Sequence, residues 1–367
     1  PPTTTPPATP PPSTGSWPVG ADALQRRVLA ELKVFTDWLD RTGAKGYIGE
    51  VGWPNNESTD RWNALADTWY QAADSKGLMV TAWATGEWWG SYNLAIYGNN
   101  GPSIGTALSP ARVVEAHRGG AGKDRGVNVN GGEFGIGGNL GTGSGGAFSN
   151  VNRGTYDQDY HYDSQATFNY LASRGVEVVR LPFRWERIQP TLGGPLDTTE
   201  LARLRDVIDR ANAAGIDVIP TVMNYGAYWM GSPGIRTPIG SSGVTNQHFA
   251  DLWRRLAVAL GDRPNISGWG LMNEPTNMPT GSAGWEQASQ AAVDAIRGAG
   301  DRHTIFVPGY NWSTARRFVE SHPNGPWIRD SLGNIRYEAH HYFDGDNSGS
   351  YGRSYDAELS DARSKGY

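Results

Sequence analysis

The sequence predicts an α/β fold, a (β/α)8 barrel in which eight parallel strands alternate with helices. Short apolar segments recur along the chain, and turn residues close each of them, as is typical of buried parallel strands. Amphipathic stretches separate these segments, which is the pattern of a barrel. The eight expected strands begin near residues 46, 79, 126, 176, 216, 266, 304 and 335.

A doubly wound sheet is the alternative fold. Such sheets bind nucleotides at a glycine-rich turn between a strand and a helix. No turn between an expected strand and helix carries GxGxxG or a phosphate-binding loop, and the run GIGGNLGTGSGG lacks the required spacing and context. We interpret that run as a surface loop and favour the barrel.

The expected elements follow one another in a regular order. Five apolar residues at helical spacing predict the first helix, over residues 21–40: Leu24, Val28, Leu32, Phe35 and Leu39. The other helices, recognised by the same spacing and by glycine stop signals, cover residues 60–76, 110–118, 164–174, 198–214, 246–260 and 283–299. The strands cover residues 46–52, 79–84, 126–129, 176–181, 216–222, 266–272, 304–307 and 335–340.

The composition excludes several classes of protein. With a formal net charge of −5 and a pI of about 5.8, the chain has no electrostatic basis for binding nucleic acid or anionic membranes. No apolar run is long enough for a transmembrane helix. The absence of cysteine rules out disulfides, thiol catalysis and cysteine-ligated metal.

Two glutamates stand at the ends of two expected strands. Glu274 follows the apolar run 266–272 within SGWGLMNEPTN, where Pro275 cannot donate to a sheet ladder and so ends the strand. Glu50 has the same position in GYIGEVGWP. Barrel enzymes keep their catalytic groups at these strand ends. A pair of carboxylates is what cleavage of a glycosidic bond requires, and 15 Trp and 16 Tyr could supply faces on which sugar rings stack.

Five motifs together resemble glycoside hydrolase family 5, the cellulase-like branch of retaining barrel glycosidases: VVRLPFRWERIQP, GWGLMNEP, YEAHHYFDGDNSGSY, GYIGEVGWP and TAWATGEWWG. The resemblance covers nearly everything after the first 15 residues. The order of the motifs departs from the family, in which the GExG and TAWA strands are seventh and eighth, whereas here they come first. The resemblance therefore implies a circularly permuted TIM barrel, and we expect residues 354–367 to lie near residues 16–22.

The resemblance also implies roles for individual residues. Glu274 matches the acid/base, whose pKa must be raised for it to donate a proton, and Glu50 matches the nucleophile, which must be ionised. The other matching positions imply an arginine beside the nucleophile, an asparagine that binds the sugar 2-hydroxyl, the two residues of an HxY motif, and a tryptophan on which the sugar stacks. These are Arg180, Asn273, His340, Tyr342 and Trp83, respectively.

Further strand-end residues are candidate substrate contacts. Where family members have HNY after the third strand, this chain has Met223-Asn224-Tyr225, and a thioether cannot donate a hydrogen bond to a sugar hydroxyl. We expect Asn224 to contact substrate, and Glu87 to bind a sugar hydroxyl or to form a salt bridge. The aromatic pairs that follow strand ends are candidate ligand-facing residues, with core packing as the alternative: Trp88-Trp89 and Tyr228-Trp229.

Residues 1–15, PPTTTPPATPPPSTG, are predicted to be an extended linker, and residues 16–367 the catalytic barrel. Such linkers lead to carbohydrate-binding modules in secreted polysaccharidases, so we expect a secreted protein with a module outside this chain. No cofactor or metal is expected, because HExxH is absent and the DGDNSGSY segment lacks the terminal glutamate of a calcium loop.

The predicted function is that of a retaining endo-β-1,4-glucanase that acts as a monomer on a polysaccharide or oligosaccharide. The same mechanism on mannan, xyloglucan or another β-glycan, or exo action, is an alternative. A carbohydrate-binding barrel without activity is the alternative from a different class. Hydrolysis and transglycosylation cannot be distinguished from the sequence.

Overall fold

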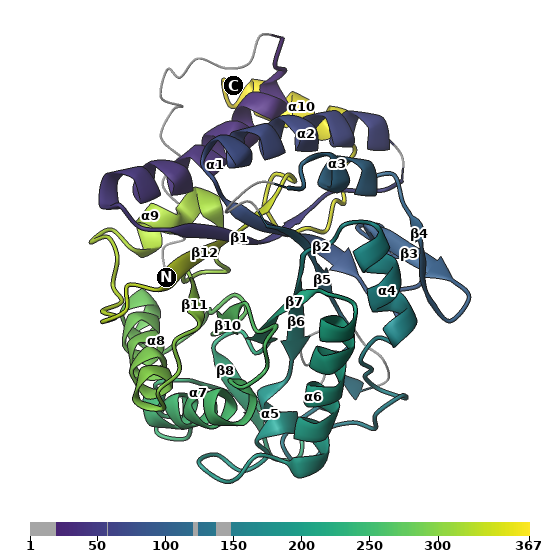
Figure 1. The fold of residues 1–367 in the computed structure, drawn as a ribbon. Coiled ribbons are helices and arrows are strands. Elements are labelled where there is room, and N and C mark those ends of the chain that lie inside the picture. Colours follow the sequence, from purple (N-terminus) through teal and green to yellow (C-terminus); the bar gives the residue numbers. More distant parts are fainter. Residues whose placement is uncertain (1–19, 57, 120–123, 137–147) are drawn as a thin grey trace.

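Figure 1 shows the computed structural model of the chain, which describes residues 20–56, 58–119, 124–136 and 148–367. The expected linker, residues 1–15, lies outside these ranges, as does most of the glycine-rich run near residue 140. Both assignments therefore stay predictions.

Eight parallel strands close into a barrel, which confirms the predicted fold class (Figure 1). Each barrel strand pairs with the next barrel strand along the chain, and the last pairs with the first. The strands are β1 (Gly46–Gly52), β2 (Met79–Thr85), β5 (Arg125–Val129), β6 (Val178–Phe183), β7 (Asp217–Val222), β10 (Gly268–Gly270), β11 (Thr304–Pro308) and β12 (Ile335–Tyr342).

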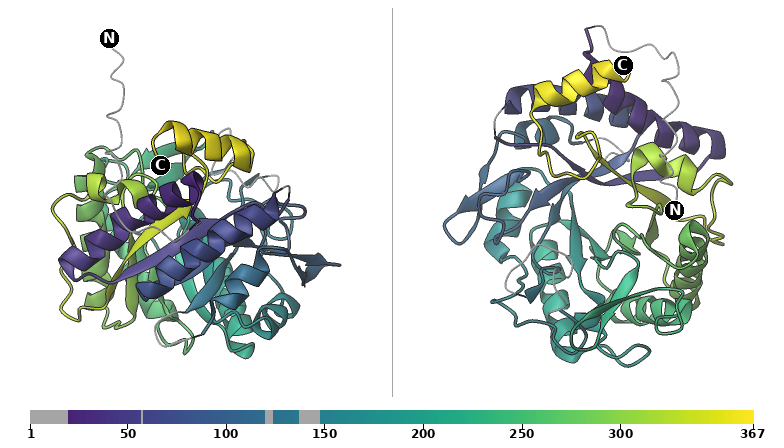
Figure 2. Two further views of the ribbon diagram at one scale, coloured as in Figure 1. Left: turned by 90° about the horizontal axis from the view of Figure 1, so that it is seen from above. Right: turned by 180° about the vertical axis from the view of Figure 1, so that it is seen from behind.

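Helices surround the barrel, as both views in Figure 2 show. They are α1 (Ala23–Thr42), α2 (Thr59–Ser75), α3 (Ala111–Ala116), α4 (Gln165–Ser173), α5 (Trp185–Ile188), α6 (Thr198–Ala213), α7 (Asn246–Leu260), α8 (Gly281–Gly298), α9 (Phe318–Ser321), α10 (Tyr355–Ser364) and the short 3-10 helix η2 (Ala315–Arg317). None of the described helices is both long and apolar enough to cross a membrane.

Helix α1 illustrates how sequence signals set these boundaries. Asp22 and Gln25 form a reciprocal capping box at its start, and Gly43 ends it with a φ of 70° in the left-handed region. The five apolar residues that predicted the helix are buried against the barrel. Each buried leucine or phenylalanine of this kind stabilises the fold by about 1.5–3 kcal/mol.

Two hairpins were not predicted, nor were the helices α5, α9 and α10 and the 3-10 helix η2. Strands β3 (Tyr97–Asn100) and β4 (Ser103–Ala107) pair after β2, and β8 (Ala227–Met230) and β9 (Ile235–Pro238) pair after β7. Both hairpins belong to loops that leave the carboxyl ends of barrel strands. The loops on this face therefore contain more regular secondary structure than their glycine- and serine-rich sequences indicated.

The barrel interior changes from apolar to polar along its length. One end is filled by a cluster of strand residues: Tyr47, Met79, Val178, Ile219 and Phe306. The pairing of β1 with β12 shifts between Ile48 and Glu50, so Gly49 forms a bulge. Because side chains alternate along a regular strand, Tyr47 and Glu50 would otherwise point to opposite sides of the sheet. The bulge lets both side chains enter the barrel.

The two ends of the described chain meet on one side of the barrel. Helix α10 lies across α1 (Figure 2), and the hydroxyl of Tyr355 donates to Asp22 Oδ2 at 2.9 Å. This confirms, for the described residue Asp22, that the C-terminal segment lies where the sequence analysis placed it.

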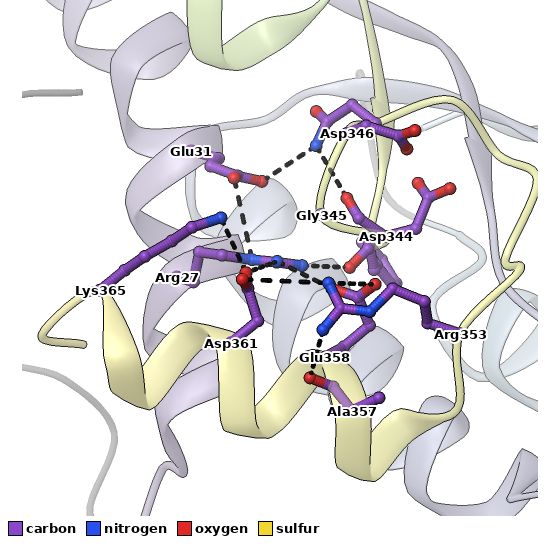
Figure 3. A network of polar contacts seen from close by, with 12 residues as sticks. Arg27, Glu31, Asp344, Gly345, Asp346, Arg353, Ala357, Glu358, Asp361 and Lys365 are labelled. Atoms are coloured by element: carbon purple, nitrogen blue, oxygen red, sulfur yellow. Dashed lines mark hydrogen bonds and ion pairs between the residues drawn. The ribbon is translucent and has the colours of Figure 1, made fainter. Parts of the chain in front are cut away.

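A buried arginine holds these two helices together (Figure 3). Arg27 of α1 is 2% exposed and its guanidinium lies 3.1 Å from Glu358 of α10 and 3.8 Å from both Asp361 and Glu31. Arg27 also donates to the carbonyl of Phe343. A single buried cation thus joins α1, α10 and the segment that follows β12.

Replacing Arg27 should be far more costly than replacing Arg61, an exposed arginine that joins α2 to α10. We expect Arg27→Met to lower the free energy of unfolding by about 3–5 kcal/mol, because the buried Glu358 would keep only the half-exposed Arg353, 3.7 Å away, as a counter-charge. Arg61→Met removes an exposed pair with Asp356 and should cost less than about 1 kcal/mol. Chemical denaturation of both variants checks this, and equal losses would contradict it.

Candidate active site

Five charged side chains from four neighbouring regions meet at the carboxyl end of the barrel. Glu50 comes from β1, Arg180 from β6, Glu338 and His340 from β12, and Glu274 from the turn after β10. All are buried except Glu274, whose side chain is 15% exposed. The structure therefore brings together both predicted catalytic glutamates and the predicted arginine and histidine.

Glu50 is held by three donors from two other strands. Arg180 Nη1 lies 3.1 Å from Oε1, and the hydroxyl of Tyr342 donates to Oε2 at 2.7 Å. His340 Nδ1 lies 3.5 Å from the same Oε2. An arginine and a hydroxyl on one carboxylate fix its orientation.

Glu274 occupies a strained turn directly beyond a short strand. Strand β10 has only three residues, fewer than predicted, and Glu274 adopts a φ of 44° in the left-handed region. Such a conformation in a residue other than glycine costs about 1–3 kcal/mol and concentrates at functional sites. Burial and the charge of Glu50 raise the pKa of Glu274, while His340 and Arg180 act in the opposite direction.

The two glutamates are close to each other. A carboxylate oxygen of Glu50, one of Glu274 and a ring nitrogen of His340 all lie within 4.8 Å of one another. This separation is shorter than the distance of about 6.5–9.5 Å between the two carboxyl groups of inverting glycosidases, which hold a water molecule between the sugar and the base. The spacing suits direct attack by one carboxylate on a sugar carbon.

Arg180 organises the floor of the site. Its Nη2 donates to Asn273 Oδ1 at 2.7 Å and lies 3.0 Å from Glu338 Oε1. Its Nη1, besides contacting Glu50, donates to Asn128 Oδ1 at 2.9 Å. The guanidinium is fully buried, so a single cation from β6 positions side chains from β1, β5, β12 and the turn after β10.

His340 bridges three carboxylates as an imidazolium. Its Nδ1 donates to Glu274 at 2.8 Å and its Nε2 donates to Glu338 at 3.0 Å. Burial alone would lower the pKa of His340, but the charge of Glu50 and the hydrogen bonds to Glu274 and Glu338 raise it to about 10. The ring is therefore positively charged at neutral pH.

An aromatic group lies on the β2 side of Glu50, where the sequence placed Trp83. Trp83 Nε1 donates to the hydroxyl of Tyr92 at 2.9 Å, and the rings of Tyr92 and Trp89 stack with centroids 4.0 Å apart. Burial, with a contribution from the charge of Glu50, raises the pKa of Tyr92 to about 12. All three rings are partly exposed, so they can offer faces to a ligand.

A second aromatic group lies near Glu274. Burial raises the pKa of Tyr225, and the negative charges of Glu274 and Glu50 raise it further. Its ring centroid lies 5.8 Å from that of Trp312, which is 45% exposed. Residues 311–313 all have positive φ values between 55° and 64°. This unusual run of left-handed residues holds a large apolar ring at the rim of the site.

Arg236 of β9 ties the loops beside this group together. Its Nη2 donates to the carbonyls of Tyr225 and Thr276 at 2.7 Å each, and its Nη1 donates to that of Asn277 at 3.2 Å. Tyr225 and Asn277 both have positive φ values. One guanidinium thus stabilises the strained turns on either side of Glu274.

Glu87 forms a salt bridge, which was the alternative to its expected role as a sugar ligand. Its Oε1 accepts from Ser164 Oγ and Thr167 Oγ1 at 2.6 Å each, and its Oε2 lies 2.9 Å from His161 Nε2. Although burial opposes this, these hydrogen bonds lower the pKa of Glu87 to about 2. Burial and the charge of Glu87 raise the pKa of neighbouring Asp163 to about 8. Glu87 forms the alternative salt bridge and anchors the loop after β2.

Asn224 and Tyr228 are also structural rather than ligand-facing. Asn224 is 1% exposed, donates to the Glu186 carboxylate at 2.7 Å and accepts from the Trp185 backbone N–H at 3.0 Å. Tyr228 is fully buried and its hydroxyl donates to the carbonyl of Gln189 at 2.8 Å. Both expectations are corrected because the two side chains, which belong to the loop that follows β7, are buried and form hydrogen bonds within the protein.

The remaining aromatic candidates are partly exposed. Trp88 stacks on His161 with ring centroids 5.2 Å apart. Trp229 lies on the β8 strand and its backbone N–H donates to Glu186. Their contact with substrate stays a prediction.

Three residues of the site were missed from the sequence. Asn128 and Glu338 lie inside expected strands, where only alternation of side chains could have indicated that they face the barrel interior. Trp312 follows the β11 strand end, the same position that singled out Glu50 and Glu274. That signal was present for Trp312 but was not used.

Comparison with known proteins identifies relatives for the second part of the chain. A family model described as Cellulase (glycosyl hydrolase family 5) matches residues 127–366. "Manganese dependent endoglucanase Eg5A" of Phanerodontia chrysosporium is 35% identical over 190 residues, which are 50% of this chain and 47% of that protein. "Endoglucanase EG-II" of Hypocrea jecorina is 31% identical over 196 residues, or 50% and 43%. The chain spans about half the length of these curated relatives.

Solved structures give a similar result. The endoglucanase Cel5A of Pseudomonas stutzeri in complex with cellobiose is 34% identical, covers 61% of each chain and has a TM-score of 0.53. XacCel5A in complex with cellopentaose is 32% identical, covers 65% of this chain and 73% of that chain, and has a TM-score of 0.54. Glu274, Arg180 and His340 lie within the stretch that the family model matches, whereas Glu50 lies before it.

Proposed function

Because the chain belongs to glycosyl hydrolase family 5, the cellulase family, we propose that it is an endo-β-1,4-glucanase that retains anomeric configuration. The close approach of Glu50 and Glu274 within 4.8 Å is the observation that carries this proposal. Retaining glycosidases place their two carboxyl groups about 5–5.5 Å apart.

The reaction proceeds in two displacements. Glu274 donates its proton to the glycosidic oxygen while a Glu50 carboxylate oxygen attacks the anomeric carbon, so the C–O bond to the leaving sugar breaks and a glycosyl ester forms. The leaving sugar departs with a hydroxyl that carries the donated proton. Glu274, now ionised, then removes a proton from water as the water oxygen attacks the same carbon and releases Glu50.

The residues that contact Glu50 and Glu274 each have a different role in the reaction. Arg180 and Tyr342 hold Glu50 in the orientation from which it attacks. Asn273, fixed by Arg180, presents its amide to the sugar 2-hydroxyl, a hydrogen bond that strengthens in the transition state. His340 donates to Glu274 and stabilises the carboxylate that forms when the proton leaves.

Two aromatic groups suit a chain of glucose units that passes over the pair. Trp83 with Trp89 and Tyr92 lies on one side, and Tyr225 with Trp312 lies on the other. Stacking of sugar rings on such faces buries their apolar C–H groups. The cellobiose and cellopentaose bound by the two solved relatives favour cello-oligosaccharides as ligands of this chain.

One residue favours an alternative substrate. Met223 stands where family members have a histidine, and its side chain is 3% exposed. The hydrogen bond that a histidine would offer to the sugar is absent from this position. The same mechanism on mannan, xyloglucan or another β-glycan is therefore the second candidate.

We further propose that the chain is a circular permutant of its family. The family match begins at residue 127 in β5, whereas β1 and β2 precede it and complete the same barrel. The contact of Tyr355 with Asp22 supports this origin because it brings the two ends of the described chain together.

We also propose that the protein is secreted, because polymeric glycans do not enter cells. We propose separately that it acts as a monomer.

The proposed activity predicts the outcome of a substrate panel. The wild-type protein should release reducing sugar from soluble β-1,4-glucan, with a mixture of oligosaccharides as first products. Glu274→Gln should lower kcat/KM on glucan by about 10²–10⁴-fold, the usual contribution of a general acid, and Glu50→Gln should abolish turnover.

Glu320→Gln, which alters an exposed glutamate, serves as the control and should leave the rate unchanged. Faster release from mannan or xyloglucan would replace the substrate but keep the mechanism. No release from any β-glycan would contradict the enzymatic assignment.

The permutation predicts that the family order also folds. A chain in which residues 124–367 precede residues 20–119, joined through a short flexible linker, should fold and hydrolyse the same glycan, because termini on the surface tolerate re-joining. Circular dichroism and the rate on glucan check this. A re-joined chain that is insoluble or inactive would contradict the proposed origin.

A further inference from the structure

Glu338 is a buried carboxylate that the two-displacement mechanism does not use. It lies on β12 two residues before His340, so both side chains point into the barrel. It is 0% exposed, and its Oε2 has no hydrogen-bond partner among the described residues. Burying an ionised carboxylate costs about several kcal/mol, so an apolar residue would fill this space at lower cost.

The chain makes room for this carboxylate at the nucleophile strand. A Cβ atom on Gly49 would lie 2.1 Å from Glu338 Oε1 and 2.7 Å from its Cδ. Gly49 is the bulged residue directly before Glu50. Gly49 therefore has two effects: its bulge turns the Glu50 side chain into the barrel, and its lack of a side chain leaves space for Glu338.

Glu338 contacts both cations that touch the catalytic pair. Its Oε1 lies 3.0 Å from Arg180 Nη2 and 3.0 Å from His340 Nε2. Arg180 reaches Glu50 with its other nitrogen, and His340 reaches Glu274 with its other nitrogen. Glu338 is thus connected to Glu50 through Arg180 and to Glu274 through His340.

The charges of the cluster balance only when Glu338 is included. Arg180 and His340 contribute two positive charges, and Glu50 and Glu338 contribute two negative charges, so a neutral Glu274 leaves the cluster neutral. Without Glu338 the buried cluster would carry an excess positive charge. In a poorly solvated site such an excess favours loss of a proton from Glu274 or His340.

We propose that Glu338 is a positioning residue that holds Arg180 and His340 in place, keeps His340 charged and, through its own negative charge, keeps the proton on Glu274. It touches neither sugar nor reacting atoms. This inference rests on the proposed function, because it assigns Glu274 the role of acid.

The titratable groups around the cluster define the expected pH response. Those that face it come from β1, β6, the β7 loop, the turn after β10 and β12: Tyr47, Glu50, Arg180, Tyr225, Glu274, His340 and Tyr342. Burial alone would raise the pKa of Glu338, but Arg180 and His340 lower it. Glu338 therefore stays ionised across the working range, and its removal takes away a constant negative charge.

Glu338→Gln should shift the alkaline limb of the pH–rate profile to lower pH by about one unit or more, because every proton leaves more easily when a nearby negative charge is removed. At the wild-type optimum kcat on soluble glucan should fall at least tenfold, while KM changes less than twofold. Glu338→Asp keeps the charge and should restore the position of the limb.

Glu200→Gln is the matched control. Glu200 is 3% exposed and accepts hydrogen bonds from Tyr160 and Tyr162, away from the pair. This variant should lose stability but keep the wild-type profile. A Glu338→Gln profile that superimposes on the wild type, with only the stability lowered as in Glu200→Gln, would overturn the inference.

The ring of His340 gives a readout that does not depend on activity. By ¹⁵N NMR, the wild-type ring should remain protonated at pH 8, and the ring in Glu338→Gln should lose its proton at a lower pH than in the wild type. An unchanged titration would overturn the inference even if the wild type hydrolyses no glucan, an outcome that by itself contradicts only the proposed function. If Glu338→Gln does not fold, the same comparison applies to Glu338→Ala, which also removes the negative charge and should again lower the pH at which the ring loses its proton.

Discussion

The pairing of Arg180 with two carboxylates inside the barrel is the constraint on which the rest of the site depends. A guanidinium without exposure to solvent is stable only if charges and acceptors surround it. Glu50, Glu338 and Asn128 provide these partners from separate strands, and Asn273 provides one from the turn after β10. The same bonds that satisfy the cation fix the nucleophile and the sugar-binding asparagine, so the stability of the cluster and its geometry have a common origin.

Local strain accompanies this arrangement at each catalytic glutamate. Glu50 follows a bulge at Gly49, and Glu274 has a left-handed backbone that L residues rarely adopt. Both departures turn a side chain toward the cluster that a regular strand would point elsewhere. The hydrogen bonds of Arg236 to the neighbouring carbonyls offset part of this cost by bracing the loops on either side of Glu274.

The barrel and its principal residues could be predicted because they follow simple rules. Apolar runs closed by turn residues located all eight strands, and strand ends located Glu50 and Glu274. The same rule did not indicate the partners of Glu87, because Ser164 and Thr167 lie at the start of helix α4, which no local pattern connects to it. It failed for Asn224 and Tyr228 because their burial depends on the unexpected hairpin after β7.

Glu338 shows a different limit of sequence reasoning. Its place inside the barrel depends on the register between β1 and β12, which the bulge at Gly49 shifts. The family resemblance supplied roles for His340 and Tyr342 but none for a residue two positions earlier. Only the assembled cluster shows that its charges balance through this carboxylate.

The central claim is that Glu50 and Glu274 form a retaining pair, and the stereochemistry of the first product tests it most directly. Proton NMR of a cello-oligosaccharide during the first minutes of hydrolysis distinguishes the two anomers before they equilibrate. The short separation of the carboxylates predicts that the β-anomer appears first and the α-anomer grows in later. Initial release of the α-anomer would show that a water molecule attacks directly, and it would contradict the account of the site.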